Sequence, residues 1–375
     1  MSTPKLKVKA DPARLAETRE RLKALLDGRR TDRIPLAFRV DDPKPLNCRD
    51  AAMDDLKSLE HQVEQMNRQF EAMPEADVLP MLNTQEFGQA FVPSLFGVEV
   101  AVDEIQPPYS HGRVIRDLRE DLARLPKRVD LEKDGWGPRL RERMRLFLEA
   151  TDYAVPIGVV DYQSPYGVAT KLIDNEALMI AMYDTPELVH ELMGRATQAI
   201  IDSVRTMQRW AGDPALIATN PDFRFPEGGC IVWDDYVSVI SPDLHTTFCL
   251  PYNERLYAEF GRGHFHTCGP YFPNYLDPVL RHKGLRSIDI SWMLRGLGRT
   301  REDMLLLKER ARAAGVVLQG PLVAKQTSMD WAEKPVDPDE DFLRRMAAGG
   351  GLLWSEGGSR DVGLKYLEMA GRCAS

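Results

Sequence analysis

Eight short apolar runs, each ending in a polar or small residue, constrain the fold of this chain more than any other feature. Segments with helical patterning separate most of them. Strand-then-helix units repeated eight times in one chain are typical of a (β/α)8, or TIM, barrel, and a doubly wound sheet is the alternative. The sequence therefore predicts an α/β barrel from runs at 34–39, 77–83, 157–163, 215–220, 264–268, 285–291, 315–320 and 351–355.

The whole chain, 1–375, is predicted to form a single barrel domain with two additions. The first is an N-terminal helical segment, 1–33, in which Asp11 is placed to cap a helix that Gly28 ends. The second is an extended insertion, 84–156, after the second run.

Two later helices are also well signalled. One begins at Thr185, a capping residue followed by proline, and ends at Gly212. The other begins at Ser241 and is predicted to run to about Phe260.

Composition excludes several classes of partner. The net charge of −8 and the pI near 5.5 argue against nucleic-acid binding, which needs a basic face. No apolar run is long enough to span a bilayer, and the first residues are charged where a signal peptide would be apolar. We therefore expect a cytoplasmic protein, without membrane partners, that acts on a small molecule. Its 5 cysteines are an odd number and widely spaced, which is typical of reduced thiols.

His266 and Cys268 form the most specific chemical pattern in the sequence. One residue separates them, so on a strand both side chains point to the same face and can hold one ion. A zinc site needs at least three protein ligands, and Asp289 and Glu356, near the ends of later runs, are placed to supply a third and a fourth. His264 shares the same alternation. The alternative is that these side chains only hydrogen-bond one another at a polar end of the barrel.

Further candidates come from the rule that catalytic residues of such barrels lie at the carboxyl ends of the strands and in the loops that follow. Asp234 and Asp235, assigned to the loop between the fourth and fifth runs, could act as a general base or bind a cationic group. Adjacent acids in a loop are also commonly solvated or cap a turn. The remaining candidates could bind substrate, form turns or pack: Arg39, Asn83, Glu86, Gln163, Tyr166, Asn220, Arg224, Trp233 and Gln319.

Several motifs together resemble the uroporphyrinogen decarboxylase superfamily, over nearly the whole chain. They are "TDRIPL" near the start, "SPDLHTTFCLPY" before the fifth run, "HTCG" at its end and "LQGPL" towards the end of the chain. Within that superfamily, the H-x-C arrangement is similar to the branch of zinc methyltransferases that move methyl groups between corrinoids and thiols. The resemblance implies a TIM barrel, a divalent metal such as zinc, and a corrinoid supplied by a partner protein.

The chain departs from these relatives in two places. True uroporphyrinogen decarboxylases carry an R-Q-A-G-R loop after the first strand, where this chain reads "FRVDDPKPL". The methyltransferases end the eighth strand with a cysteine ligand, where this chain reads "WSEGGS", so the resemblance makes Glu356 the substitute ligand. A site with one nitrogen, one sulfur and two oxygen ligands would be harder than a thiolate-rich one.

Three functions follow from these patterns. The first is a metal-dependent methyltransferase in which His266, Cys268, Glu356 and Asp289 bind the metal and Asp289, Asp234 and Asp235 serve in catalysis. The second is a decarboxylase or other lyase, with Arg39 and Arg224 holding a carboxylated substrate. The third is a barrel without activity that binds a tetrapyrrole or corrinoid.

Overall fold

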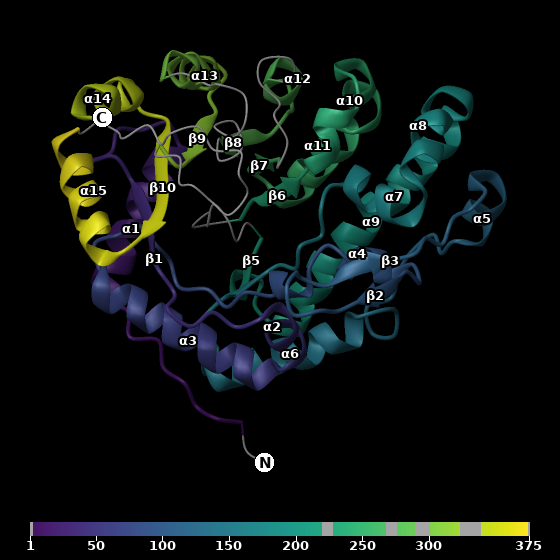
Figure 1. The fold of residues 1–375 in the computed structure, drawn as a ribbon, viewed down its shortest axis with the longest axis horizontal. Coiled ribbons are helices and arrows are strands. Elements are labelled where there is room, and N and C mark those ends of the chain that lie inside the picture. The colour runs from purple at the N-terminus through teal and green to yellow at the C-terminus, as the bar shows by residue number, and fades with distance from the viewer. Residues whose placement is uncertain (1–2, 220–227, 268–275, 290–300, 323–338, 374–375) are drawn as a thin grey trace.

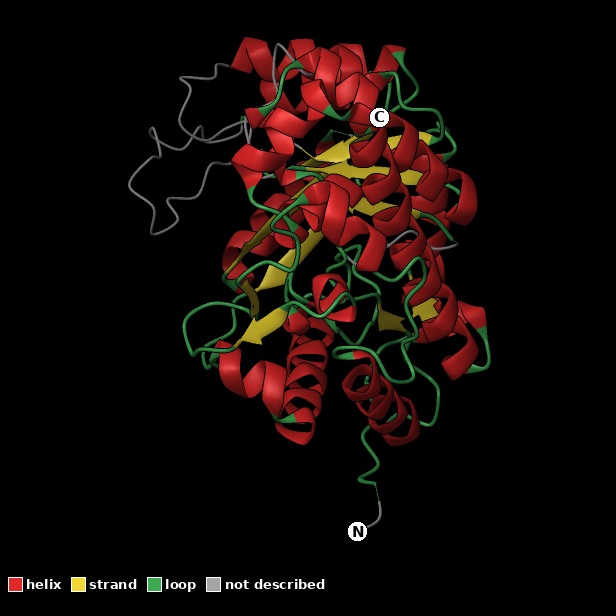
Figure 2. Ribbon diagram, turned by 90° about the vertical axis from the view of Figure 1, so that its right-hand side faces the viewer, coloured by secondary structure: helices red, strands yellow, loops and turns green. Residues whose placement is uncertain are grey.

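A computed structural model describes residues 3–219, 228–267, 276–289, 301–322 and 339–373. Its main sheet has six strands, all paired in parallel, in the order β1-β10-β9-β8-β7-β6. Helices lie outside the arc of strands (Figures 1 and 2). The strands are β1 (Leu36–Val40), β6 (Cys230–Trp233), β7 (Gly263–His266), β8 (Leu285–Asp289), β9 (Val317–Gly320) and β10 (Leu352–Gly358).

Short strand segments occupy the rest of the ring. The parallel pair β4 (Ile157–Gly158) and β5 (Ile217–Ala218) is joined to the second predicted run by a bridge from Leu82 to the start of β4. That run is joined to β1 by a 2.7 Å hydrogen bond from the Asp77 amide to the Leu36 carbonyl. The predicted α/β fold of the TIM-barrel type is confirmed. Over the described residues, its hydrogen-bonded ladder is divided into a six-stranded sheet and this shorter pair.

Two of the strand predictions need correction. The 77–83 run forms an isolated bridge at Leu82 rather than a strand. The segment predicted as a loop before Asp234 contains β6, because the apolar residues "CIVW" pair with β7 over their whole length. Asp234 and Asp235 therefore directly follow a strand and do not lie in the middle of a loop.

The helix predictions agree closely with α1 (Pro12–Leu26) and α9 (Pro186–Ala211). The Asp11 carboxylate caps α1 by accepting a 2.9 Å hydrogen bond from the Ala13 amide. The single helix predicted for 241–260 is wrong, since it is two helices, α10 (Pro242–Phe248) and α11 (Leu250–Phe260), with Cys249 between them. Pro251 explains the break, because proline has no amide proton with which to continue the helical hydrogen-bond ladder.

The predicted insertion, 84–156, contains local elements packed beside the barrel: η1 (Gln85–Phe87), α4 (Phe91–Leu95), β2 (Glu99–Ala101), β3 (Tyr109–His111), α5 (Leu118–Arg124) and α6 (Gly137–Ala150). The division into domain segments stays a prediction. The other elements are α2 (Cys48–Met53), α3 (Asp55–Ala72), α7 (Pro165–Leu172), α8 (Asn175–Asp184), η2 (Pro214–Leu216), η3 (Asp235–Val239), α12 (Leu276–Leu280), α13 (Arg301–Ala313), α14 (Glu340–Ala347) and α15 (Arg360–Arg372). None of the described helices combines the length and apolar character that a membrane crossing requires.

The N-terminal helix packs near the end of the barrel where β9 and β10 begin. Leu22, Leu25 and Leu26 of α1 form one buried cluster with Val317 of β9 and Leu353 of β10. Since side chains alternate along a strand, this cluster fixes which residues of β9 and β10 face inward. The predicted N-terminal helix is thus confirmed, and it packs against β9 and β10.

The residues that alternate with these inward-facing ones point outward, towards the helices. Phe38 of β1 and Trp354 of β10 both contact the ring of Tyr366 in α15, with centroids 6.2 and 4.8 Å apart. Phe38 also stands opposite Glu356 in the strand register. The alternation therefore places Glu356 on the outer face of β10, beside Trp354.

Candidate functional site

His266 lies between two carboxylates at the carboxyl ends of neighbouring strands. Its Nδ1 contacts Oδ2 of Asp289, the last residue of β8, in a hydrogen-bonded ion pair. Its Nε2 lies 3.9 Å from Oδ1 of Asp235, which follows β6. The structure therefore brings together three residues that the sequence selected separately.

His264 supports this group from one layer deeper in the barrel. Its Nδ1 lies 2.8 Å from the Ser287 hydroxyl, and its Nε2 lies 3.8 Å from Oδ2 of Asp289. Burial raises the pKa of the Asp289 carboxyl, but the ion pair with His266 and the hydrogen bonds from both histidines outweigh burial and lower it to about 2. Asp289 is therefore an anion at neutral pH, and it fixes the orientation of the His266 ring.

Asp234 and Asp235 point in different directions although they are adjacent. Trp233 stands opposite His266 in the register, so it faces the barrel interior and the next residue faces the helices. Asp234 is fully buried there; it accepts hydrogen bonds from the Ser164 hydroxyl at 3.1 Å and from Asn253 Nδ2 at 3.2 Å. The two acids predicted to work together thus belong to different environments.

A second group of chemically reactive side chains surrounds Asp234. Ligand atoms of Asp234, His245 and Cys249 all lie within 4.8 Å of one another, and all three residues are buried. Neither His245 nor Cys249 was among the site residues predicted from the sequence. The signal that could have found them is their spacing, because residues four apart share one face of a helix.

Comparison with known proteins identifies the family. Residues 17–323 match the family described as uroporphyrinogen decarboxylase (URO-D). The chain belongs to the uroporphyrinogen decarboxylase family. A uroporphyrinogen decarboxylase of Xylella fastidiosa is 25% identical over 179 residues, which span 39% of this chain and 46% of that protein. The match thus covers less than half the length of this relative.

A methyltransferase from Methanosarcina mazei has a similar structure. It superposes with a TM-score of 0.62 and 17% identity, over 91% of this chain and 92% of that one. At this identity the likeness establishes the fold of this uroporphyrinogen decarboxylase family member and nothing about its activity. The resemblance expected from the motifs is confirmed.

Glu356, the predicted fourth ligand, already has defined partners in this family member. Its Oε1 accepts hydrogen bonds from the Leu322 amide at 2.9 Å and from Trp354 Nε1 at 3.1 Å. The side chain is 7% exposed. These contacts tie the chain after β9 to β10, while the role of Glu356 as a metal ligand stays a prediction.

We expect Glu356→Ala to destabilise the fold, because it leaves two buried donors without an acceptor, each at a cost of about 1–3 kcal/mol. Glu356→Gln keeps an acceptor oxygen and should remain within about 1 kcal/mol of wild type. Urea denaturation of both variants measures the difference. Equal stability of the two variants would contradict this structural role, and metal content measured on Glu356→Gln tests the ligand role separately.

Gln163 follows the third predicted run in an unusual conformation. Its φ of 61° lies in the left-handed region, which residues other than glycine seldom adopt. Its Nε2 donates to Asp161 at 2.7 Å, and its buried Oε1 has no hydrogen-bond partner among the described residues. Such outliers concentrate at binding sites, which agrees with the prediction that Gln163 binds substrate.

The other predicted binding residues are more scattered. Gln319 stands opposite Asp289 in the register, and Arg39 is exposed near the end of β1. Tyr166 is buried in α7, and the Asn83 side chain accepts a 2.8 Å hydrogen bond from the Gln85 amide in a local turn. The remaining predicted residues lie outside the described part of the chain: Asn220, Arg224 and Cys268.

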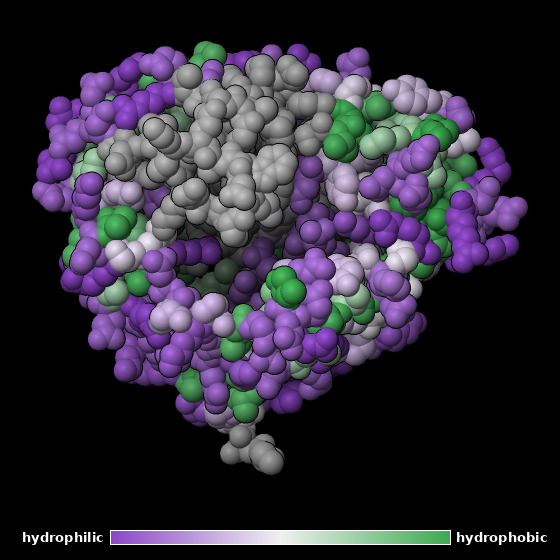
Figure 3. Space-filling view, viewed as in Figure 1, coloured by the Kyte–Doolittle hydropathy of each residue, from purple (hydrophilic) through white to green (hydrophobic). Residues whose placement is uncertain are grey.

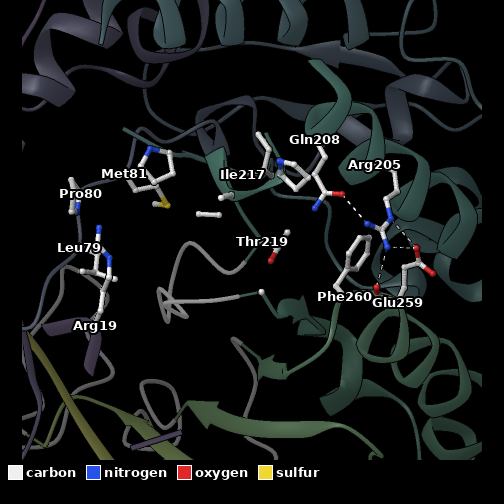
Figure 4. Close-up of a pocket in the computed structure, with 15 residues that line it drawn as sticks. Arg19, Leu79, Pro80, Met81, Arg205, Gln208, Ile217, Thr219, Glu259 and Phe260 are labelled. Carbon is white, nitrogen blue, oxygen red and sulfur yellow. Dashed lines mark hydrogen bonds and ion pairs between the residues drawn. The ribbon is translucent and has the colours of Figure 1, made fainter. Parts of the chain in front are cut away.

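The structure has a hollow on one face (Figure 3) and a cavity whose lining can be compared with the predicted site residues. The face shown in Figure 3 is hollowed at its centre. A separate cavity of about 570 Å³, drawn in Figure 4, is lined by Arg19 of α1, Met81, Thr219 and the ion-paired Arg205 and Glu259. None of its lining residues is a predicted site residue. The cavity in Figure 4 therefore gives no support to the predicted site.

Proposed function

We propose that this chain is a metal-dependent methyltransferase whose active site lies at the barrel mouth, the end where the parallel strands finish. The observation that supports it best is the placement of His266 between Asp289 and Asp235. Family membership and the fold shared with the Methanosarcina mazei methyltransferase agree with this proposal.

The residues at the mouth fit a metal ion. Asp289 contacts Nδ1 of His266, which leaves Nε2 on the other side of the ring, towards Asp235. A carboxylate that orients a histidine in this way is typical of metal centres. His266, through Nε2, and Cys268 would hold the ion, while Asp289 orients the imidazole and Glu356 lies on the outer face of β10. Nitrogen and sulfur ligands suit zinc. Such an ion acts as a Lewis acid on a bound thiol or hydroxyl group.

Each side chain at the mouth has a separate role in the proposed reaction. Asp289 keeps the imidazole of His266 in one tautomer and one orientation. Asp235 offers a carboxylate that can hold the proton leaving an acceptor group. Gln319 near the end of β9, Trp233 at the end of β6 and Gln163 in the segment after β4 bind the small-molecule acceptor. A corrinoid on a partner protein supplies or receives the methyl group.

The test mixes purified protein, with and without zinc, with methylcobalamin and a set of small thiols. We expect metal-dependent loss of the cobalt–carbon absorbance together with a methylated thiol, and about one ion at the mouth of each chain. A protein that neither retains nor takes up a divalent metal, yet is active, would overturn the proposal.

The second candidate is a decarboxylase, favoured by the family description and by Arg39, which is exposed near the end of β1. We predict that uroporphyrinogen is not decarboxylated at an appreciable rate, because "FRVDDPKPL" lacks the second arginine of the R-Q-A-G-R loop. Several carboxylates on one macrocycle need paired guanidinium groups. Chromatography of the porphyrin products checks this, and accumulation of coproporphyrinogen would reverse the ranking. Tight corrinoid or tetrapyrrole binding without turnover would favour the third function, a binder without activity.

A further inference from the structure

We propose that Asp234, His245 and Cys249 form a second metal site, buried in the barrel wall, that binds a structural zinc ion and fastens α10 and α11 to the end of β6. The site is separate from the barrel mouth. Asp234 belongs to the helix-facing side of the wall, whereas Asp235 and His266 belong to the interior side.

The backbone hydrogen bonds that continue from α10 into α11 place the proposed ligands His245 and Cys249 on one face. Cys249 donates its amide to the His245 carbonyl at 2.9 Å, and Asn253 donates its amide to the Cys249 carbonyl at 3.0 Å. His245, Cys249 and Asn253 therefore follow one another at one-turn intervals on a single face. This face packs against the outer side of the strands, where the His245 ring contacts Phe265 of β7 with centroids 6.2 Å apart.

Apart from His245, whose Nε2 lies 3.6 Å from Oδ2 of Asp234 and which is cationic only when protonated, no cationic side chain lies near Asp234 in the described part of the chain. No lysine or arginine lies within ion-pair distance of it in the described part of the chain, and its hydrogen-bond donors, Ser164 and Asn253, are neutral. A buried carboxylate without a cation is costly. A divalent ion would remove this cost, whereas a water molecule would not.

His282, the other histidine nearby, does not supply the missing charge. Its Nδ1 lies 2.8 Å from the Val279 carbonyl, so this nitrogen carries a proton. Its Nε2 lies 3.4 Å from Asn253 Nδ2, which is a donor, so this second nitrogen must be the acceptor. A ring with one donor and one acceptor is neutral.

His245 points to an ion more directly. The residue is 0% exposed, and neither ring nitrogen has a hydrogen-bond partner among the described residues, although Nε2 lies only 3.6 Å from Oδ2 of Asp234. Buried polar groups without partners are rare in native proteins, and a bound ion can satisfy them. Within the described part of the chain, the buried Oδ1 of Asn253 also has no hydrogen-bond partner.

The donor set and its burial define the kind of ion. One imidazole, one thiol and one carboxylate suit zinc, which binds nitrogen, sulfur and oxygen in closed structural sites. Asp234, His245 and Cys249 are all 0% exposed, so a substrate cannot reach the ion. Binding such an ion contributes directly to folding.

The main test compares the metal content of three full-length proteins purified without chelators. We expect about two ions per chain in wild type and about one in both His245→Phe and His266→Ala. Phenylalanine fills the space of the imidazole beside Phe265 and removes only the ligand. Undiminished metal content in His245→Phe, or a His266→Ala protein without metal, would overturn the buried site. If His245→Phe loses metal while His266→Ala keeps the wild-type amount, only the site at the mouth is contradicted.

A spectroscopic test does not depend on the stability of His245→Phe. Cys268→Ser, which removes the thiol predicted for the mouth, is refolded with Co²⁺ in place of zinc. We expect a thiolate-to-cobalt charge-transfer band in the near ultraviolet from Cys249, absent in Cys268→Ser combined with Cys249→Ser. A Cys268→Ser protein that folds with cobalt but shows no such band would overturn the site.

Discussion

Replacement of His266 by alanine is expected to lower kcat/KM for methyl transfer by about a thousandfold, because metal activation contributes several kcal/mol and each 1.36 kcal/mol is tenfold in rate. The same change should remove the ion at the mouth. Asp289→Asn should have a smaller effect, about 10- to 100-fold in metal affinity, because it removes the group that orients the ligand. Steady-state kinetics with methylcobalamin, together with metal titration, measures both.

The matched control is His190→Ala. His190 is a half-buried histidine on α9 whose Nδ1 lies 2.9 Å from the Tyr252 hydroxyl. Its replacement should leave both rate and metal content unchanged. A His266→Ala enzyme that retains wild-type kcat/KM would mean that the imidazole has no part in the reaction.

The part of the site that could be predicted rests on local rules. His266 was found through its spacing from Cys268, and Asp289 because it lies near the end of a later apolar run; parallel strands bring such ends together. Their direct contact follows from neighbouring positions in the sheet, with β7 beside β8. The sequence alone does not tell which carboxylate binds His266 and which one packs elsewhere.

The buried group around Asp234 could be predicted only in part. The spacing of His245 and Cys249 places them on one face of a helix whether or not the helix breaks between them. Their meeting with Asp234 depends on β6, which is only four residues long and turns Asp234 towards the helices. Missing this strand placed both acids in a loop.

Glu86 shows how a polar residue after a predicted strand can be structural. It was selected as a polar residue beyond the end of a run, yet its Oε2 accepts hydrogen bonds from the Ser58 hydroxyl at 2.7 Å and from Arg143 Nη1 at 3.0 Å. Arg143 lies on α6, within the predicted insertion, and sequence spacing carries no information about such a pairing. The polar character of Glu86 is therefore explained by an ion network and needs no substrate.

Arg143→Ala should be the most destabilising substitution outside the site, at about 3–5 kcal/mol, because removing one partner leaves buried charges uncompensated. The Arg143 side chain is 0% exposed; it pairs with Asp55 at 2.6 Å and Glu86 at 3.0 Å, and donates to the carbonyls of Ala51 and Ala52. Urea denaturation measures the loss. The control is Arg145→Ala on the same helix, whose exposed pairs with Glu142 and Glu149 should contribute about 0–1 kcal/mol.

The pH dependence of this loss separates charge from packing. Burial already raises the pKa of Glu86 above its usual value in the wild type, despite the hydrogen bond from Ser58 and the charge of Arg143, which lower it. Without Arg143 this pKa should rise further, so the folded variant binds a proton on Glu86 more readily than the unfolded chain does. The stability that this proton contributes is fully present below the pKa of Glu86 in the unfolded chain. It is lost as the pH rises through the pKa of Glu86 in the folded variant. The difference in unfolding free energy between Arg143→Ala and wild type should therefore narrow as the pH falls from neutral. A difference that stays constant would assign the loss to packing of Arg143 against Phe87, whose ring centroid lies 4.3 Å from the guanidinium carbon.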